Sequence, residues 1–231
     1  GEYVLLLNPD TVVEESTFSS VIEYLDNNLD VGCLGVKMID GNGNYLPESK
    51  RGFPSPLTAL YKLIGLTKIF PRSEIFGRYY LGHLDNNLIQ EVEVISGACM
   101  FIRKKVLDSI GPLDEDYFMY GEDIDLSYRI HLAGFKIVYF PFTTIIHYKG
   151  QSTKKSSFNY VIVFYKAMKV FTHKHLKGRN ATLLNFIIDI AIYLRASTAI
   201  AYRILQKVFY PLFDFLLIVL GFNIFTQPWA E

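Results

Sequence analysis

The chain has 231 residues, of which 50% are hydrophobic and 15% are aromatic. This composition excludes a disordered chain, because disordered segments are poor in such residues and rich in charge. The formal net charge is zero, from 23 basic and 23 acidic residues, so the chain as a whole has no bias towards nucleic acid, which we do not expect as a partner.

The charges are divided unevenly between two parts of the chain. Residues 1–150 hold 13 Lys and Arg against 20 Asp and Glu, a net charge of −7, whereas residues 151–231 hold 10 against 3, a net charge of +7. An acidic first part suits chemistry with metals or other cations, and a basic, apolar second part suits an anionic surface as its partner. We therefore expect two regions, 1–150 and 151–231.

Strands and helices alternate in the first region. Apolar runs predict strands at 3–7 and 31–39, and the helical spacing of Phe18, Val21, Ile22 and Leu25 predicts a helix between them. The first strand, which we take to be parallel to its neighbours, ends before Pro9. The later predicted elements are a short helix within 54–70, a strand over 92–102, a short helix ending at residue 111, a helix over 122–133, a strand over 135–140 and an extended segment over 143–148. This alternation indicates an α/β fold.

The start of the chain and its two cysteines indicate the sequence context and the cellular compartment. The chain opens at Gly1 rather than Met and enters its first strand at once, and a domain rarely begins inside its core, so we expect further sequence before this point. No secretory signal is visible. Cys33 and Cys99 lie among apolar residues without disulfide or zinc spacing, which predicts two buried thiols in a reducing compartment.

The second region reads as long helices over 156–174, 181–210 and 211–222, joined to the first region by a linker at 150–157. Basic residues alternate with large apolar ones, which is typical of an interfacial amphipathic helix on anionic lipid. Charged residues also interrupt every apolar run before it reaches the 18 or so residues of a membrane-spanning helix. These residues are Asp189, Arg195, Arg203, Lys207 and Asp214. A soluble helical bundle or a homodimer interface remains the alternative.

The strongest chemical signal is an acidic cluster, with six carboxylates between residues 114 and 125. Large apolar and aromatic residues interrupt it, and carboxylates beside such residues tend to have raised pKa values, which favours proton transfer. A helix start at Glu122 acts in the opposite direction by stabilising the anion. We assign Glu122 and Asp123 to function, whereas Asp125 and Arg129 have the i,i+4 spacing of a helix-stabilising pair.

Two further positions suggest a ligand site. Asn8-Pro9-Asp10 is ordinary turn chemistry, but it follows the first strand, where open α/β sheets place ligands. Asp10 there is able to hold a Mg²⁺ or Mn²⁺ ion that a diphosphate already chelates. His147 closes a hydrophobic run, and a single His in that setting is more often structural.

Taken in order, several motifs resemble those of glycosyltransferase family 2, and above all its rhamnosyltransferase-like members. The resemblance covers about residues 2–153 and implies an incomplete GT-A (Rossmann-like) fold, namely an α/β mixed sheet with flanking helices, followed by an α-helical C-terminal extension. Only seven residues precede Asn8, where the family has a nucleotide-binding segment, so we expect a fragment or half of a split enzyme. The motifs are Asn8-Pro9-Asp10, Arg51-Gly52-Phe53-Pro54, Gly97 to Arg103, Asp114 to Leu126 with Arg129, Ala133-Gly134-Phe135, and His147.

The resemblance also implies a role for each of these site residues. Asp10 matches the last acid of the family's metal-binding Asp-x-Asp element, Asn8 replaces the first, and His147 matches a downstream metal ligand. The metal would be Mn²⁺ or Mg²⁺, and the mixed carboxylate and imidazole set favours Mn²⁺. Asp123 matches the catalytic base. Substrate binding is expected of Asn8, of Gly97 at the donor sugar, and of Glu122 or Asp125 at acceptor hydroxyls.

The implied function is inverting transfer of a sugar, rhamnose by branch resemblance, from a nucleotide-diphosphate donor to a glycan or lipid-linked acceptor in cell-surface polysaccharide synthesis. We expect a cytoplasmic protein, peripheral on the inner face of the cell membrane, with 151–231 contacting the anionic lipid surface. One alternative is a non-catalytic glycan-binding or assembly module. A metal-dependent hydrolase is a third reading.

Overall fold

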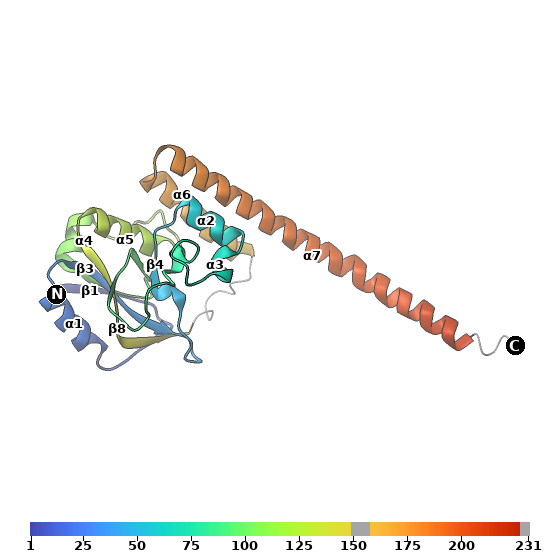
Figure 1. Ribbon diagram of the computed structural model, residues 1–231, viewed down its shortest axis with the longest axis horizontal. Coiled ribbons are helices and arrows are strands. Elements are labelled where there is room, and N and C mark those ends of the chain that lie inside the picture. Colours follow the sequence, from blue (N-terminus) through green and yellow to red (C-terminus); the bar gives the residue numbers. More distant parts are fainter. Residues whose placement is uncertain (149–157, 227–231) are drawn as a thin grey trace. The chain divides into compact units, whose positions relative to one another are not determined.

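The structure is a computed structural model that describes residues 1–148 and 158–226. Its centre is a mixed sheet in the order β1-β7-β3-β8-β2, with β5 also paired to β8, and this sheet with its flanking helices confirms the predicted fold class (Figure 1). A separate small sheet joins β4 to β6. The strands are β1 (Tyr3–Leu7), β2 (Thr11–Val13), β3 (Val31–Ile39), β4 (Lys50–Arg51), β5 (Gln90–Glu91), β6 (Val94–Ile95), β7 (Cys99–Arg103) and β8 (Lys136–His147).

The strand directions correct one prediction. β3 and β8 run parallel, but β7 is antiparallel to both of its neighbours, β1 and β3. The expected parallel direction of β1 is therefore wrong with respect to β7, the strand with which it pairs. The consequence for the site is that the end of β1 lies beside the start of β7, where the backbone N–H of Asn8 donates to the carbonyl of Ala98 at 3.0 Å.

Helices lie on both faces of the sheet. The helices of the first region are α1 (Thr17–Asn27), α2 (Pro56–Leu63), α3 (Leu66–Ile69), α4 (Lys104–Ile110) and α5 (Glu122–Leu132), with short 3₁₀ turns η1 (Pro47–Ser49) and η2 (Arg78–Tyr80). Figure 1 shows α1 on one side of the sheet and α4 and α5 on the other. The predicted helices at 18–25 and 122–133 are confirmed, while the one expected within 54–70 is divided between α2 and α3.

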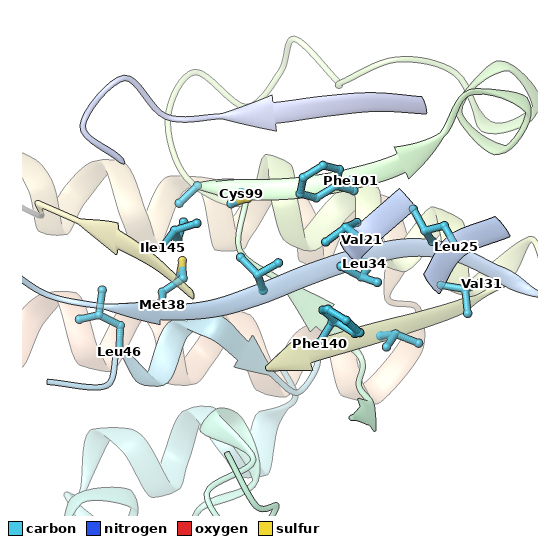
Figure 2. Close-up of a cluster of buried hydrophobic side chains, with 13 residues drawn as sticks. Val21, Leu25, Val31, Leu34, Met38, Leu46, Cys99, Phe101, Phe140 and Ile145 are labelled. Carbon is cyan, nitrogen blue, oxygen red and sulfur yellow. The ribbon is translucent and has the colours of Figure 1, made fainter. Parts of the chain in front are cut away.

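The core has two layers because successive strand residues point to opposite faces of a sheet. Cys33 belongs to the layer under α4 and α5, whereas the next residue, Leu34, belongs to the layer under α1. Figure 2 shows the α1 layer, in which Val21 and Leu25 of the helix meet Phe101 of β7. Both cysteines are free and buried, and burial raises the pKa of Cys99 to about 12 and that of Cys33 further. The prediction of buried thiols is confirmed.

Two strand predictions need revision. Residues 92–102, predicted as one strand, form β6 and β7 in different sheets, with residues 96–98 crossing between them. Both strands are buried, so the apolar run continues across the break and conceals it. The two segments over 135–148 instead form the single strand β8, in which Phe140 and Thr144 face consecutive residues of β3, so a bulge accommodates Pro141.

The second region is helical, as predicted. α6 spans Phe158–His175 and α7 spans Gly178–Thr226, with Pro211 inside α7 rather than at a helix break. The chain separates into two compact units, Gly1–Ile188 and Asp189–Glu231. The linker predicted at 150–157 and the boundary at 150 fall outside the described residues. Within the described part of the chain, no helix is long and apolar enough to cross a membrane.

Candidate active site

The acidic helix α5 begins at an unusual turn. Tyr120 and Gly121 have φ values of 68° and 88°, the left-handed region that side chains rarely adopt. A Cβ on Gly121 would also lie 3.1 Å from the ring of Tyr117 and 3.2 Å from Ala167 of α6, so glycine is required here for space as well as for backbone freedom. This turn points the first residues of α5, Glu122 and Asp123, at the segment between β6 and β7.

Asp123 is held from three sides. Its Oδ2 pairs with the guanidinium of Arg51 from β4 and accepts the backbone N–H of Gly97 at 3.2 Å. Its Oδ1 accepts the N–H of Ile124 at 2.8 Å. Burial lowers the pKa of Arg51, but the neighbouring Asp123 and Tyr79 together more than offset this effect, so the pKa lies above its usual value and the guanidinium stays charged. Asp123 therefore has a fixed orientation while 13% of its side chain stays exposed.

Glu122 lies beside Asp123 and is partly buried. Burial, followed by the negative charge of Asp123, raises the pKa of the Glu122 carboxyl. Its Oε2 atom is buried and accepts no hydrogen bond from the residues that the structure describes. Glu122 Oε1 would lie 3.8 Å from a Cβ on Gly97, in ordinary contact. The structure thus brings Gly97, Glu122 and Asp123 together.

Asn8 connects this group to the metal-binding candidates. The N–H of Asn8 donates to Ala98, the residue after Gly97, and the Asn8 carbonyl accepts the hydroxyl of Thr11 at 2.7 Å. Asp10 lies two residues further along the same turn. The turn after β1 and the acidic start of α5 are therefore joined through the segment 96–98.

Asp10 and His147 form a second pair, because β2 aligns Thr11 with His147 at the end of β8. His147 Nε2 lies 3.2 Å from Asp10 Oδ1. Two ligands bound at about 2.1 Å and at right angles lie about 3.0 Å apart, so these atoms fit a common divalent cation. Among the residues described, no cluster of three or more His, Cys, Asp or Glu side chains surrounds such an ion. Diphosphate and water are able to supply further ligands to such an ion.

Asp125 has a different setting from its neighbours. Its side chain is 1% exposed, and its two oxygens contact Arg129 Nε at 2.8 Å and His175 Nε2 at 2.6 Å. The predicted i,i+4 pair with Arg129 is confirmed. The structure does not support the assignment of Asp125 to acceptor binding, because its carboxylate is not exposed. The carboxylate instead links α5 to the end of α6.

Sequence reasoning gave no role to two residues of this region. Arg51 belongs to the motif Arg51-Gly52-Phe53-Pro54, but its pairing with a carboxylate 72 residues away has no local signal. No sequence motif points to Glu93, whose Oε2 accepts the N–H of Phe53 at 2.6 Å and whose Oε1 pairs with Arg78. Glu93 thereby holds the backbone beside Arg51.

The comparisons with known proteins identify the family. The model of the glycosyltransferase-like family 2 matches residues 1–161, and the chain belongs to this family. N-acetylglucosaminyl-diphospho-decaprenol L-rhamnosyltransferase of Mycobacterium tuberculosis is 28% identical over 171 residues, 74% of this chain and 54% of its own length. Rhamnosyltransferase WbbL of Escherichia coli is 29% identical over 150 residues, 64% and 52% of the two chains. Among solved structures, that of GalNAc-T7 with UDP, GalNAc and Mn²⁺ aligns over 89% of this chain and 41% of its own, with 15% identity and a TM-score of 0.43.

The chain spans about half the length of these two curated relatives. The resemblance to a rhamnosyltransferase-like branch, drawn from short motifs, is confirmed at the level of the family.

Proposed function

We propose that this chain belongs to an inverting glycosyltransferase that moves a sugar from a nucleotide-diphosphate donor to a glycan or lipid-linked acceptor in polysaccharide synthesis. The names of the two curated relatives favour rhamnose as the sugar. The observation that carries the proposal is the arrangement around Asp123, in a chain of this family.

Asp123 acts as the general base. A carboxylate has about four acceptor positions, and the donors described above, Arg51, Gly97 and Ile124, use three of them. One position on Oδ1 is left for an acceptor hydroxyl. Asp123 takes the proton of that hydroxyl as its oxygen bonds to the anomeric carbon and the bond from that carbon to the diphosphate oxygen breaks. A base in this position contributes roughly 10²- to 10⁴-fold to the rate.

Asp10 and His147 hold the divalent cation, Mn²⁺ in preference to Mg²⁺, together with the donor diphosphate. When bound, the cation supplies positive charge that neutralises the departing diphosphate. Asn8 fixes the turn that carries Asp10, and Gly97 presents an N–H to Asp123 beside the donor. Glu122, beside Asp123 at the start of α5, binds an acceptor hydroxyl.

The exposed apolar helix of the second region supports a proposal for the acceptor and for the place where the protein acts. A lipid-linked acceptor accounts for an exposed apolar helix in the same chain, and we propose that the protein works at the inner face of the cell membrane. The alternative is that this helix forms the interface of a homodimer.

Transfer of radiolabelled sugar from dTDP-rhamnose or a UDP-sugar tests the proposal, measured on the complete protein with Mn²⁺. We expect turnover that Asp123→Asn lowers by about 10²-fold or more, with an unchanged circular dichroism spectrum. Glycan binding without turnover, unaffected by this substitution, would instead support a binding module. Cleavage of glycan without any sugar donor would support a hydrolase.

A further inference from the structure

The helix α7 exposes an unusual amount of apolar surface between residues 207 and 222. Its large apolar side chains there are 39–70% exposed, whereas large contiguous apolar patches are rare on soluble proteins. We call this stretch the apolar segment. These side chains are Val208, Phe209, Tyr210, Leu212, Phe213, Phe215, Leu216, Leu217, Ile218, Val219, Leu220 and Phe222.

The two charged residues of the apolar segment, Lys207 and Asp214, lie along one narrow line together with Gly221. Successive helical residues are about 100° apart, so residues seven apart differ in direction by only about 20°. Lys207, Asp214 and Gly221 have this spacing and define the line. The exposed apolar residues occupy the remaining arc of about 280°. In the apolar segment, the apolar face of the helix is therefore much wider than the polar face.

The width of this arc limits what covers it. A helix that is apolar nearly all round is buried either inside a protein or in lipid. A single partner helix, such as that of a second copy of the chain, covers only one face of such a helix. Lipid hydrocarbon surrounds a helix on most sides. The position of Asp214 near the middle of the segment opposes a spanning orientation, which would place the carboxylate deep in the membrane. An in-plane helix keeps the whole polar line at the headgroups.

We propose that the apolar segment lies in the plane of the membrane, immersed among the acyl chains of one leaflet, with Lys207, Asp214 and Gly221 towards the headgroups. This refines the membrane association proposed above. Burial of apolar surface drives it, and the charges of Lys207 and Asp214 cancel, so anionic lipid is not required.

Flotation of the complete protein with vesicles tests the driving force. We expect binding to neutral phosphatidylcholine vesicles that persists at high salt. Leu216→Asp, which places a charge opposite the polar line, should lower partitioning by about tenfold or more. Gly221→Asp places the same charge on the line and serves as the matched control, with partitioning lowered less than about threefold.

Depth measurements test the orientation. Phe209→Cys and Leu216→Cys are seven residues apart on the deep face, and Gly221→Cys is on the polar line. Each is labelled with an environment-sensitive dye and quenched by lipids brominated at known depths. Cys33 and Cys99 are 0% and 2% exposed and should stay unlabelled. We expect equal depths at 209 and 216 and a shallower label at 221.

Three results would overturn the inference. Depths at 209 and 216 that differ by about 10 Å would indicate a spanning helix. Binding only to anionic vesicles, lost at high salt, would indicate electrostatic surface attachment. Absence of lipid quenching, with concentration-dependent dimerisation in sedimentation that Leu216→Asp abolishes, would indicate a second copy. Sugar transfer to a water-soluble acceptor, assayed on the same variants, reports separately on the proposed activity.

Discussion

Arg51 and Asp123 form a salt bridge in which the two side chains are only 10% and 13% exposed. The pair joins β4 to the start of α5 and also includes the backbone N–H of Gly97. A partly buried pair of this kind adds orientation rather than net stability, because desolvation offsets much of the attraction. We infer that Arg51 keeps Asp123 facing the substrate, and that the pair is a part of the catalytic arrangement that short motifs do not show.

Replacement of Arg51 should therefore affect catalysis more than donor binding. Arg51→Lys keeps the charge but not the planar geometry of the guanidinium, so we expect kcat to fall about tenfold with a similar KM for the donor. Arg51→Ala should also destabilise the fold by about 3 to 5 kcal/mol, because it leaves Asp123 unpaired. Arg78→Lys, in the more exposed pair with Glu93, is the control and should change kcat little. Equal effects of Arg51→Lys and Arg78→Lys would contradict a positioning role.

The proposed metal ligands, Asp10 and His147, should make metal binding depend on the donor. With only these two protein ligands in the described chain, we expect weak binding of Mn²⁺ alone and much tighter binding with a nucleoside diphosphate. Titration calorimetry of Mn²⁺ with and without the nucleotide measures the difference. His147→Ala should abolish the gain, while Glu91→Ala, an exposed change on β5, should not. Tight binding of the metal without nucleotide would indicate a separate metal site.

Two ion pairs with i,i+4 spacing should differ greatly in their contribution to the free energy of unfolding. Sequence spacing alone gives Asp125 and Arg129 about 0.2 to 0.5 kcal/mol. In the structure Asp125 is 1% exposed, so Asp125→Asn leaves the Arg129 cation poorly compensated and should lower the free energy of unfolding by about 3 kcal/mol. Asp108→Asn breaks the exposed pair with Lys104 and should change the free energy of unfolding by less than about 0.5 kcal/mol. Denaturant unfolding of both variants provides the comparison, and similar losses would contradict the argument.

Lys50 should make stability depend on pH. Its side chain is fully buried, Nζ donates to the carbonyls of Leu81 and Leu84 at 2.9 and 3.0 Å, and burial lowers its pKa to about 8. Below pH 8 Lys50 is charged in both the folded and the unfolded state. Between pH 8 and the usual value near 10.5, only the unfolded state keeps the proton, so the free energy of unfolding rises with pH by about 1.4 kcal/mol for each unit.

Denaturant titrations at pH 7.5 and about pH 9.5 measure this slope. Lys50→Met removes the titrating group at similar volume, so the part of the slope due to Lys50 should disappear in the variant, whatever its absolute stability. An unchanged slope in Lys50→Met would show that other groups are responsible.

The elements with a local signal could be predicted from the amino-acid sequence. β3 over Val31–Ile39 and α5 from Glu122 follow from apolar runs and helix-start signals, and the structure reproduces both closely. The order of short motifs also identified the family that the comparisons confirm. The site residues drawn from those motifs remain predictions, although Gly97, Glu122 and Asp123 do meet in the structure.

Tertiary structure decided what depends on contacts between distant residues. The antiparallel pairing of β1 with β7, the break at Gly97 and the pairing of Arg51 with Asp123 have no local signature, because strand partners and salt bridges are chosen by packing of the whole domain. The same holds for Asp125, where burial converts an ordinary helix pair into an internal link. Side-chain spacing fixes which groups are neighbours along a helix, but only the folded chain fixes how much water surrounds them.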